Sequence, residues 1–164
     1  MTTRRRVRPA DSDRGFYRQA MVRVERSVLV GYSAQRMYAL VADIERYPDF
    51  LPWCDTARID SRDDTLVTAT LDVNYHGVRQ QFTTRNSQVA DTQITMKLLR
   101  GPFRTLDGLW RFTALDEEAC KIEFSLEYQF SSALLGKLVG PVFGHIANTF
   151  VEAFVKRADA LYGA

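Results

Sequence analysis

Apolar and polar residues alternate along most of the chain between residues 22 and 130, with the period of two that marks a strand with one buried face. The clearest run extends from Ile122 to Phe130, where every second residue is apolar or aromatic. Turn-forming pairs such as His76-Gly77 and Gly101-Pro102 separate the runs. The pattern predicts strands at 22–30, 67–75, 78–89, 94–98, 106–115 and 122–130, with one more after Cys54. This order is typical of a meander of about six to seven antiparallel strands.

Two segments follow the helical period instead. Ser33 can cap a helix that extends to about Asp43, because its hydroxyl accepts a free N–H group of the first turn. Pro48 and Pro52 forbid a continuous helix in the next segment, so a short helical turn is expected between them. From Ser132 to Tyr162 apolar residues recur at three-, four- and seven-residue steps, which predicts a long C-terminal helix. The predicted fold is α+β of the helix-grip type: a curved antiparallel sheet wrapped round this helix, with two short helices after the first strand.

Small residues interrupt the predicted C-terminal helix. Gly136, Gly140 and Gly144 are four residues apart and share one side of it, and Pro141 removes a backbone hydrogen bond. An interior glycine costs about 0.8–1 kcal/mol relative to alanine, and an interior proline about 3 kcal/mol. This predicts a kink, or a break near Gly140-Pro141 with Pro141 as the first residue of the main helix. Two interpretations stay open: a hinged lid over a ligand, or two helices joined by a corner.

The composition is that of one globular domain, since 46% of the 164 residues are hydrophobic and 26% are charged. The net charge of +2 is too small to indicate nucleic-acid binding by itself. Residues 1–20, however, hold six arginines against two aspartates. We expect a disordered basic extension over 1–20, followed by a domain over 21–164. An unstructured tail is the favoured interpretation of the extension, and an arm that touches RNA or anionic lipid is the alternative.

The sequence offers little to a catalytic or metal site. His76 and His145 have no metal-ligand spacing, and no phosphate-binding or nucleophile motif is present. Cys54 is expected to be a packed core thiol, because nothing near it in sequence lowers its pKa. Cys54 and Cys120 are too far apart in sequence to suggest a redox pair, which fits a reducing cytosol. The longest uncharged stretch, 138–151, is too short to span a bilayer. We therefore expect a protein without enzymatic activity or cofactor.

The number of large apolar side chains on the predicted inner faces is the most unusual feature. A curved sheet round one helix can leave an apolar slot for an elongated hydrophobic molecule. An ordinary aromatic core is the alternative, and composition alone favours it. If the slot exists, its expected walls are Trp110, Phe112, Phe124, Leu126, Tyr128, Phe143 and Phe150.

A segment near the end of the first third of the chain carries the most specific motif. The string Tyr47-Pro48-Asp49-Phe50-Leu51-Pro52-Trp53-Cys54 resembles the coenzyme-Q-binding and ribosome-association-toxin (RatA) family, a branch of the START-like superfamily. Supporting matches are Tyr32-Ser33-Ala34, Phe82-Thr83-Thr84-Arg85-Asn86, Gly101-Pro102-Phe103, Trp110-Arg111-Phe112 and Ala153-Phe154. The similarity covers about 22–163. It implies a helix-grip fold with a hydrophobic tunnel and no catalytic apparatus.

The resemblance implies two functions. Mitochondrial-type members bind ubiquinone and support respiratory electron transfer, whereas bacterial-type members are described as toxins that bind the large ribosomal subunit and block subunit joining. The aromatic surplus favours a non-enzymatic carrier of ubiquinone or a similar lipid, with Arg26 or Tyr75 as donor to its polar head. The expected location is the cytoplasm, with peripheral contact at the inner membrane.

The alternative is a ribosome-binding regulator. Arg79 and Arg85 fall on one strand face and could meet ribosomal RNA, although a solvated sheet face explains them equally well. A cyclase or dehydrase of the same superfamily ranks last, because no acid–base pair is evident. DNA is not an expected partner.

Overall fold

The structure is a computed structural model that describes residues 21–163; the predicted basic extension, 1–20, lies outside them. Seven strands, two helices and one 3-10 helix follow one another along the chain. Their bounds are β1 Val22–Val30, α2 Ala34–Ala42, η1 Ile44–Asp49, β2 Cys54–Asp63, β3 Leu66–Tyr75, β4 Val78–Val89, β5 Gln93–Arg100, β6 Phe103–Asp116, β7 Ala119–Phe130 and α3 Ala133–Tyr162.

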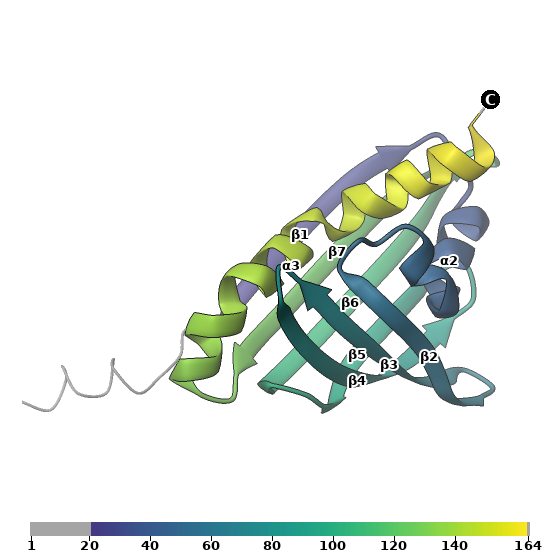
Figure 1. Ribbon diagram of the computed structural model, residues 1–164. Coiled ribbons are helices and arrows are strands. Elements are labelled where there is room, and N and C mark those ends of the chain that lie inside the picture. Colours follow the sequence, from purple (N-terminus) through teal and green to yellow (C-terminus); the bar gives the residue numbers. More distant parts are fainter. Residues whose placement is uncertain (1–20, 164) are drawn as a thin grey trace, which may run out of the picture.

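The strands form one curved antiparallel sheet in the order β1-β7-β6-β5-β4-β3-β2. β1 therefore pairs with the last strand of the meander, in a register that places Arg26 opposite Phe124. The long helix α3 runs diagonally across one face of the sheet, and α2 lies near its C-terminal half (Figure 1). This arrangement confirms the predicted α+β helix-grip fold with two short helical elements after the first strand.

The core lies between α3 and the inner face of the sheet. Every second residue of β7, from Cys120 to Phe130, is buried, as its alternating sequence predicts. The same alternation buries Leu106, Trp110 and Phe112 on β6. From the helix, Phe143, Ile146, Ala147, Val151, Phe154 and Ala158 face these strands and are buried. One apolar layer therefore joins the helix to the sheet.

Both α-helices begin at serine caps. Ser33 Oγ accepts a hydrogen bond from the Arg36 N–H at 3.1 Å, and Ser132 Oγ accepts one from the Leu135 N–H at 3.2 Å. The helical turn expected between Pro48 and Pro52 is displaced: the 3-10 helix η1 spans 44–49 and includes Pro48. The element ends one residue after Pro48, so the proline, which has no N–H to donate, removes only one possible hydrogen bond of a short helix.

The predicted break at Gly140-Pro141 is wrong, because α3 continues through Pro141 for all of its 30 residues. In Figure 1 it is one unbroken ribbon that changes direction along its length, in agreement with the kink. By length and composition alone, α3 could cross a membrane. This differs from the expectation that the uncharged stretch 138–151 is too short to span a bilayer. In the structure, 39% of the most apolar window of α3 is buried. Its inner face packs on the sheet, so part of this hydropathy is that of core contacts, whereas Leu134 and Leu138 are exposed.

Candidate functional site

An apolar cavity of about 60 Å³ lies between α3 and the middle of the sheet. Its lining comes from η1, from the segment before β2, from five neighbouring strands and from α3. The lining residues are Ile44, Tyr47, Trp53, Ala69, Leu71, Phe82, Thr84, Asn86, Met96, Leu106, Phe124, Leu126, Phe143, Ile146, Ala147 and Phe150. Among these described residues there is no carboxylate, histidine, lysine or arginine. The walls can therefore bind an apolar group but offer no acid–base pair.

Four of the residues that the sequence suggested for a slot line this cavity: Phe124, Leu126, Phe143 and Phe150. Phe124 and Leu126 come from the inner face of β7, and the two phenylalanines come from α3. The rings of Phe124 and Phe150 lie 5.6 Å apart across the layer, centroid to centroid. The helix and the sheet therefore meet at this point, as the alternation of β7 predicts.

The other three aromatic candidates are buried in the core beside the cavity and are not among its walls. Trp110 packs on Phe124, with ring centroids 4.7 Å apart. Phe112 meets Tyr38 of α2 edge to face, and Tyr128 meets Phe143 in the same way at 4.7 Å. A strand pattern assigns a residue to a face of the sheet, but it does not say which residues on that face contact empty space.

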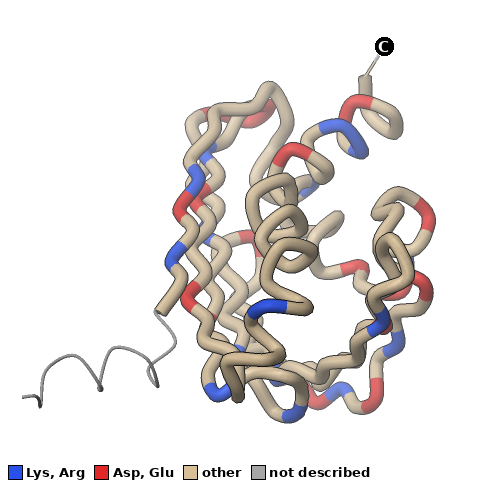
Figure 2. Tube along the Cα trace, turned by 60° about the vertical axis from the view of Figure 1, so that its left-hand side comes forward, with Lys and Arg blue, Asp and Glu red and all other residues tan. Residues whose placement is uncertain are grey.

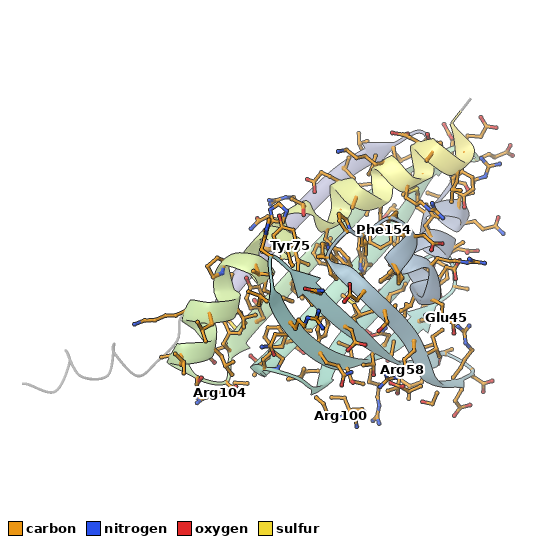
Figure 3. All side chains as sticks on the ribbon, in the orientation of Figure 1. Glu45, Arg58, Tyr75, Arg100, Arg104 and Phe154 are labelled. Carbon is orange, nitrogen blue, oxygen red and sulfur yellow. The ribbon has the colours of Figure 1, made fainter. Side chains whose placement is uncertain are left out.

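The two predicted donors to a ligand head also lie outside the cavity lining. Arg26 Nη2 donates a hydrogen bond to Asn148 Oδ1 at 2.8 Å, and its Nε lies 3.7 Å from Glu152 Oε1. The carboxylate and amide partners of Arg26 thus come from α3. Tyr75 stacks on His145 of the same helix with ring centroids 5.3 Å apart, and Figure 3 shows it beside the helix ribbon. Arg26 thus connects α3 to the edge strand β1, and Tyr75 contacts α3 from β3; their role toward a ligand stays a prediction.

Strand β4 supplies wall residues that the sequence did not suggest as ligand contacts. Phe82, Thr84 and Asn86 lie on its inner face, and Thr84 and Asn86 are buried at 7% and 4% exposure. Asn86 Oδ1 has no hydrogen-bond partner among the described residues. Leaving such a buried acceptor unpaired costs about 1–3 kcal/mol. The sequence did contain a signal for these wall residues, because they belong to the Phe82–Asn86 stretch that resembles the family. The stretch is polar, however, and polar strands are typically solvated.

Two other polar groups near the cavity, the Tyr47 hydroxyl and the Cys54 thiol, stay protonated at neutral pH. The Tyr47 hydroxyl donates to the carbonyl oxygen of Val41 at 2.5 Å, and burial raises the pKa of this phenol. Burial, followed by the charges of Asp55 and Asp72, raises the pKa of the Cys54 thiol to about 12. At neutral pH Cys54 is protonated and a poor nucleophile. This agrees with its prediction as a packed core thiol.

The outer face of β4 and β5 carries a second candidate site. Arg85 lies directly opposite Lys97 in the β4–β5 register, and Arg79 and Arg100 are exposed on the same two strands. We call Arg79, Arg85, Lys97 and Arg100 the basic strip. In the described part of the chain no salt bridge involves any of the four. Like charges placed directly opposite each other destabilise a sheet, and here Lys97 also lies opposite Asp107 of β6, whose carboxylate offsets part of the repulsion.

Carboxylates border the basic strip on the side of β2 and β3. A hydrogen bond from Thr70, followed by one from Arg58, lowers the pKa of Asp60. Hydrogen bonds from Thr56 and Gln81 lower the pKa of Asp72. Both carboxylates are ionised at neutral pH, so they disfavour an anionic partner on β2 and β3. Figure 2 shows acidic and basic residues interspersed on the strands, whereas α3 has a long stretch without charge.

These features define a START-like fold with an apolar interior. The family model described as "Polyketide cyclase / dehydrase and lipid transport" matches residues 30–155, and the chain belongs to this family. It is 43% identical over 140 residues to the ribosome association toxin RatA of Pseudomonas aeruginosa, covering 85% of this chain and 97% of that protein. It is also 43% identical over 144 residues to RatA of Escherichia coli K12, covering 88% and 91%.

A more distant relative is named for coenzyme Q binding. The mitochondrial coenzyme Q-binding protein homolog B of Xenopus laevis is 28% identical over 141 residues, covering 84% of this chain and 58% of that protein. Among solved structures, an 18 kDa protein of Caulobacter crescentus matches with a TM-score of 0.67 and 31% identity over 87% of this chain and 99% of its own. The Streptomyces aromatase/cyclase Zhui matches with a TM-score of 0.71 at 20% identity over 85% and 94%, which shows the fold alone.

Proposed function

We propose that this protein associates with the ribosome, and that the basic strip contacts RNA of the large subunit. The names of the relatives at 43% identity support association with the ribosome, and the exposed cations on β4 and β5, which form no salt bridge in the described part of the chain, supply a surface for it. Phosphate groups would add to the Asp107 carboxylate opposite Lys97 in offsetting the repulsion between Arg85 and Lys97. The proposal also makes the cytoplasm the place of action.

Reversing two charges of the basic strip should weaken this association. In the double variant Arg85→Glu/Lys97→Glu, affinity for purified large subunits should fall by about 10–100-fold, and the salt dependence of binding should lose about one phosphate contact per cation removed. Co-sedimentation in sucrose gradients at several salt concentrations measures both quantities. Because the two residues are exposed, the fold should remain intact.

Arg23→Glu/Lys121→Glu is the matched control. It makes the same change in net charge on β1 and β7, where each cation already has a carboxylate partner. This control should bind like the wild type apart from a uniform electrostatic loss. If both double variants lose affinity equally, the basic strip has no special role. If the wild type itself does not migrate with large subunits, the ribosome proposal fails.

We further propose that the protein binds a hydrophobic ligand without enzymatic activity, with a polyisoprenoid quinone as the candidate. The apolar cavity under α3 favours this second function, and the coenzyme Q-binding relative supplies the ligand class. Each buried CH₂ group of a tail contributes about 0.8 kcal/mol. The cavity of about 60 Å³ is far below the ~300–1,000 Å³ of ordinary ligand sites, so α3 must move outward to admit a tail. Loading from the inner membrane is part of this proposal.

The exchange of backbone amides tests whether α3 opens. In the ligand-free protein, amides of residues 134–146 should exchange faster than those of 147–158, because the first segment contains Pro141 and fewer buried side chains. Added quinone should slow the exchange of 134–146. Mass spectrometry of an organic extract of the untreated protein identifies a natural ligand. Slow, uniform exchange along the whole helix, together with an empty extract and no uptake of quinone, would reject the carrier function.

A further inference from the structure

The amide of Asn86 is the one polar group in the cavity whose acceptor is fully buried and unpaired within the described part of the chain. Thr84 lies two residues earlier on the same face of β4, and the remaining walls are apolar except for Tyr47. The Tyr47 hydroxyl is already used by Val41. A molecule in the cavity therefore meets carbon surface on nearly every side and a hydrogen-bond acceptor on β4.

A buried acceptor without a partner opposes folding, so its presence needs a reason. A leucine side chain, which branches in the same way, would satisfy the apolar surroundings at position 86 without this penalty. No described donor reaches Asn86 Oδ1, so contacts within the described part of the chain do not account for this acceptor. Groups that lower stability and serve no structural contact are common at functional sites.

The cavity can be enlarged beside Asn86. Met96 lies directly opposite Asn86 in the β4–β5 register and lines the cavity. Its side chain has three rotatable bonds and adapts to new neighbours. Gly108 faces Met96 across the β5–β6 pair, and a Cβ atom at residue 108 would collide with the Met96 methyl group. The missing side chain at Gly108 therefore gives Met96 room beside the cavity.

We propose that Asn86 Oδ1 accepts a hydrogen bond from the hydroxyl group of a flat aromatic ring, of the phenol or hydroquinone class, bound in this cavity. The inference rests on the proposed ligand-binding function and adds its specificity. A ring with a hydroxyl group supplies the missing donor, whereas a ring with carbonyl or ether oxygens supplies only acceptors. Asn86 Oδ1 thus favours the reduced, hydroquinone form of the proposed quinone ligand over its oxidised form, and the apolar walls contribute affinity without direction.

Three small probes of nearly equal shape test this selection: para-cresol, para-methylanisole and toluene. An apolar cavity without a partner would prefer toluene, because a buried hydroxyl group loses its bonds to water. With Asn86 as acceptor, para-cresol should bind the wild type about 5–10-fold more tightly than either other probe. Titration calorimetry gives the affinities, and NMR shifts of Met96, Phe124 and Phe150 show that the probe is in the cavity.

The variant Asn86→Leu should reverse the order, so that toluene binds more tightly than para-cresol. It should also unfold at a temperature at least as high as the wild type, with a gain of about 2–4 °C. Gln88→Leu is the control: Gln88 is half-buried on the same face of β4 but does not line the cavity. This variant should keep the preference for para-cresol.

The outcomes separate the two proposals. Equal binding of the three probes by the wild type would overturn the role of Asn86 and leave ligand binding standing, with water as the partner of the amide. Equal binding of para-methylanisole and para-cresol would show that the site does not select a donor. A lower unfolding temperature of Asn86→Leu would assign Asn86 to the fold. Failure of all three probes and of quinone to bind would remove the ligand-binding function as well.

Discussion

Replacing Phe154 by alanine is expected to lower the free energy of unfolding by about 3–5 kcal/mol. Phe154 is fully buried at the centre of the layer between α3 and the sheet, where Figure 3 labels it. Its ring lies 5.1 Å from Phe50 and 5.3 Å from both Tyr47 and Trp110, centroid to centroid. The variant would lose the transfer energy of the ring and leave a cavity that these rigid neighbours cannot fill. Urea unfolding followed by fluorescence measures the loss.

Leu138→Ala provides the control on the same helix. Leu138 is 60% exposed, so its truncation should change stability by no more than about 0.5 kcal/mol. A similar loss in both variants would show that α3 contributes through helix formation alone and not through its buried face. A loss in Phe154→Ala that is well below 2 kcal/mol would show that the layer around it collapses freely.

The fold was predictable because its most buried strands carry the strongest local signals. β7 is apolar at every second residue since one of its faces contacts α3 and the other is solvated. The positions of β1, β3 and β4 follow from turn residues and alternation in the same way. Ser33 marked the start of α2 because a hydroxyl cap needs no tertiary contact. These signals are local in sequence, so they survive without knowledge of the fold.

The continuity of α3 was harder to predict. The energetic penalties of Pro141 and its glycines favour a break, yet the helix continues. The buried residues on both sides of Pro141, including Val139 and Phe143, share one packing surface on the sheet. Burying these side chains contributes about 1.5–3 kcal/mol each and exceeds the local penalty of the proline. Tertiary packing therefore overrides propensity here.

The walls of the cavity were only partly predictable, because they depend on contacts between strands that are distant in sequence. Phe124 and Phe150 were found through periodicity, whereas Asn86 and Met96 reach the cavity through the β4–β5 register. β4 alternates between an inner face toward the cavity and an outer face toward solvent. As a result, Arg85 and Asn86 serve different surfaces although they are adjacent in sequence. A pattern of polar residues therefore conceals that one strand faces two different surfaces.

Replacing Gly101 by alanine should lower the free energy of unfolding by at least about 2 kcal/mol. Gly101 has a φ of +153°, which L-residues rarely adopt, and it connects β5 to β6. A Cβ atom there would lie 2.7 Å from Phe82 Cβ and 3.3 Å from Phe82 Cα. Since the second contact is with backbone, β4 would have to shift, and Phe82 with it.

The shift of Phe82 in Gly101→Ala should also change the shape of the cavity, because Phe82 lines it. Thermal or urea unfolding measures the stability loss, and titration with para-cresol measures the loss of binding. Gly144→Ala is the matched control with the opposite sign: a Cβ atom at Gly144 meets no atom within 4 Å, so alanine should stabilise α3 by about 0.5–1 kcal/mol. Equal, small effects of both substitutions would contradict the argument that the close approach of Gly101 to Phe82 shapes this end of the site.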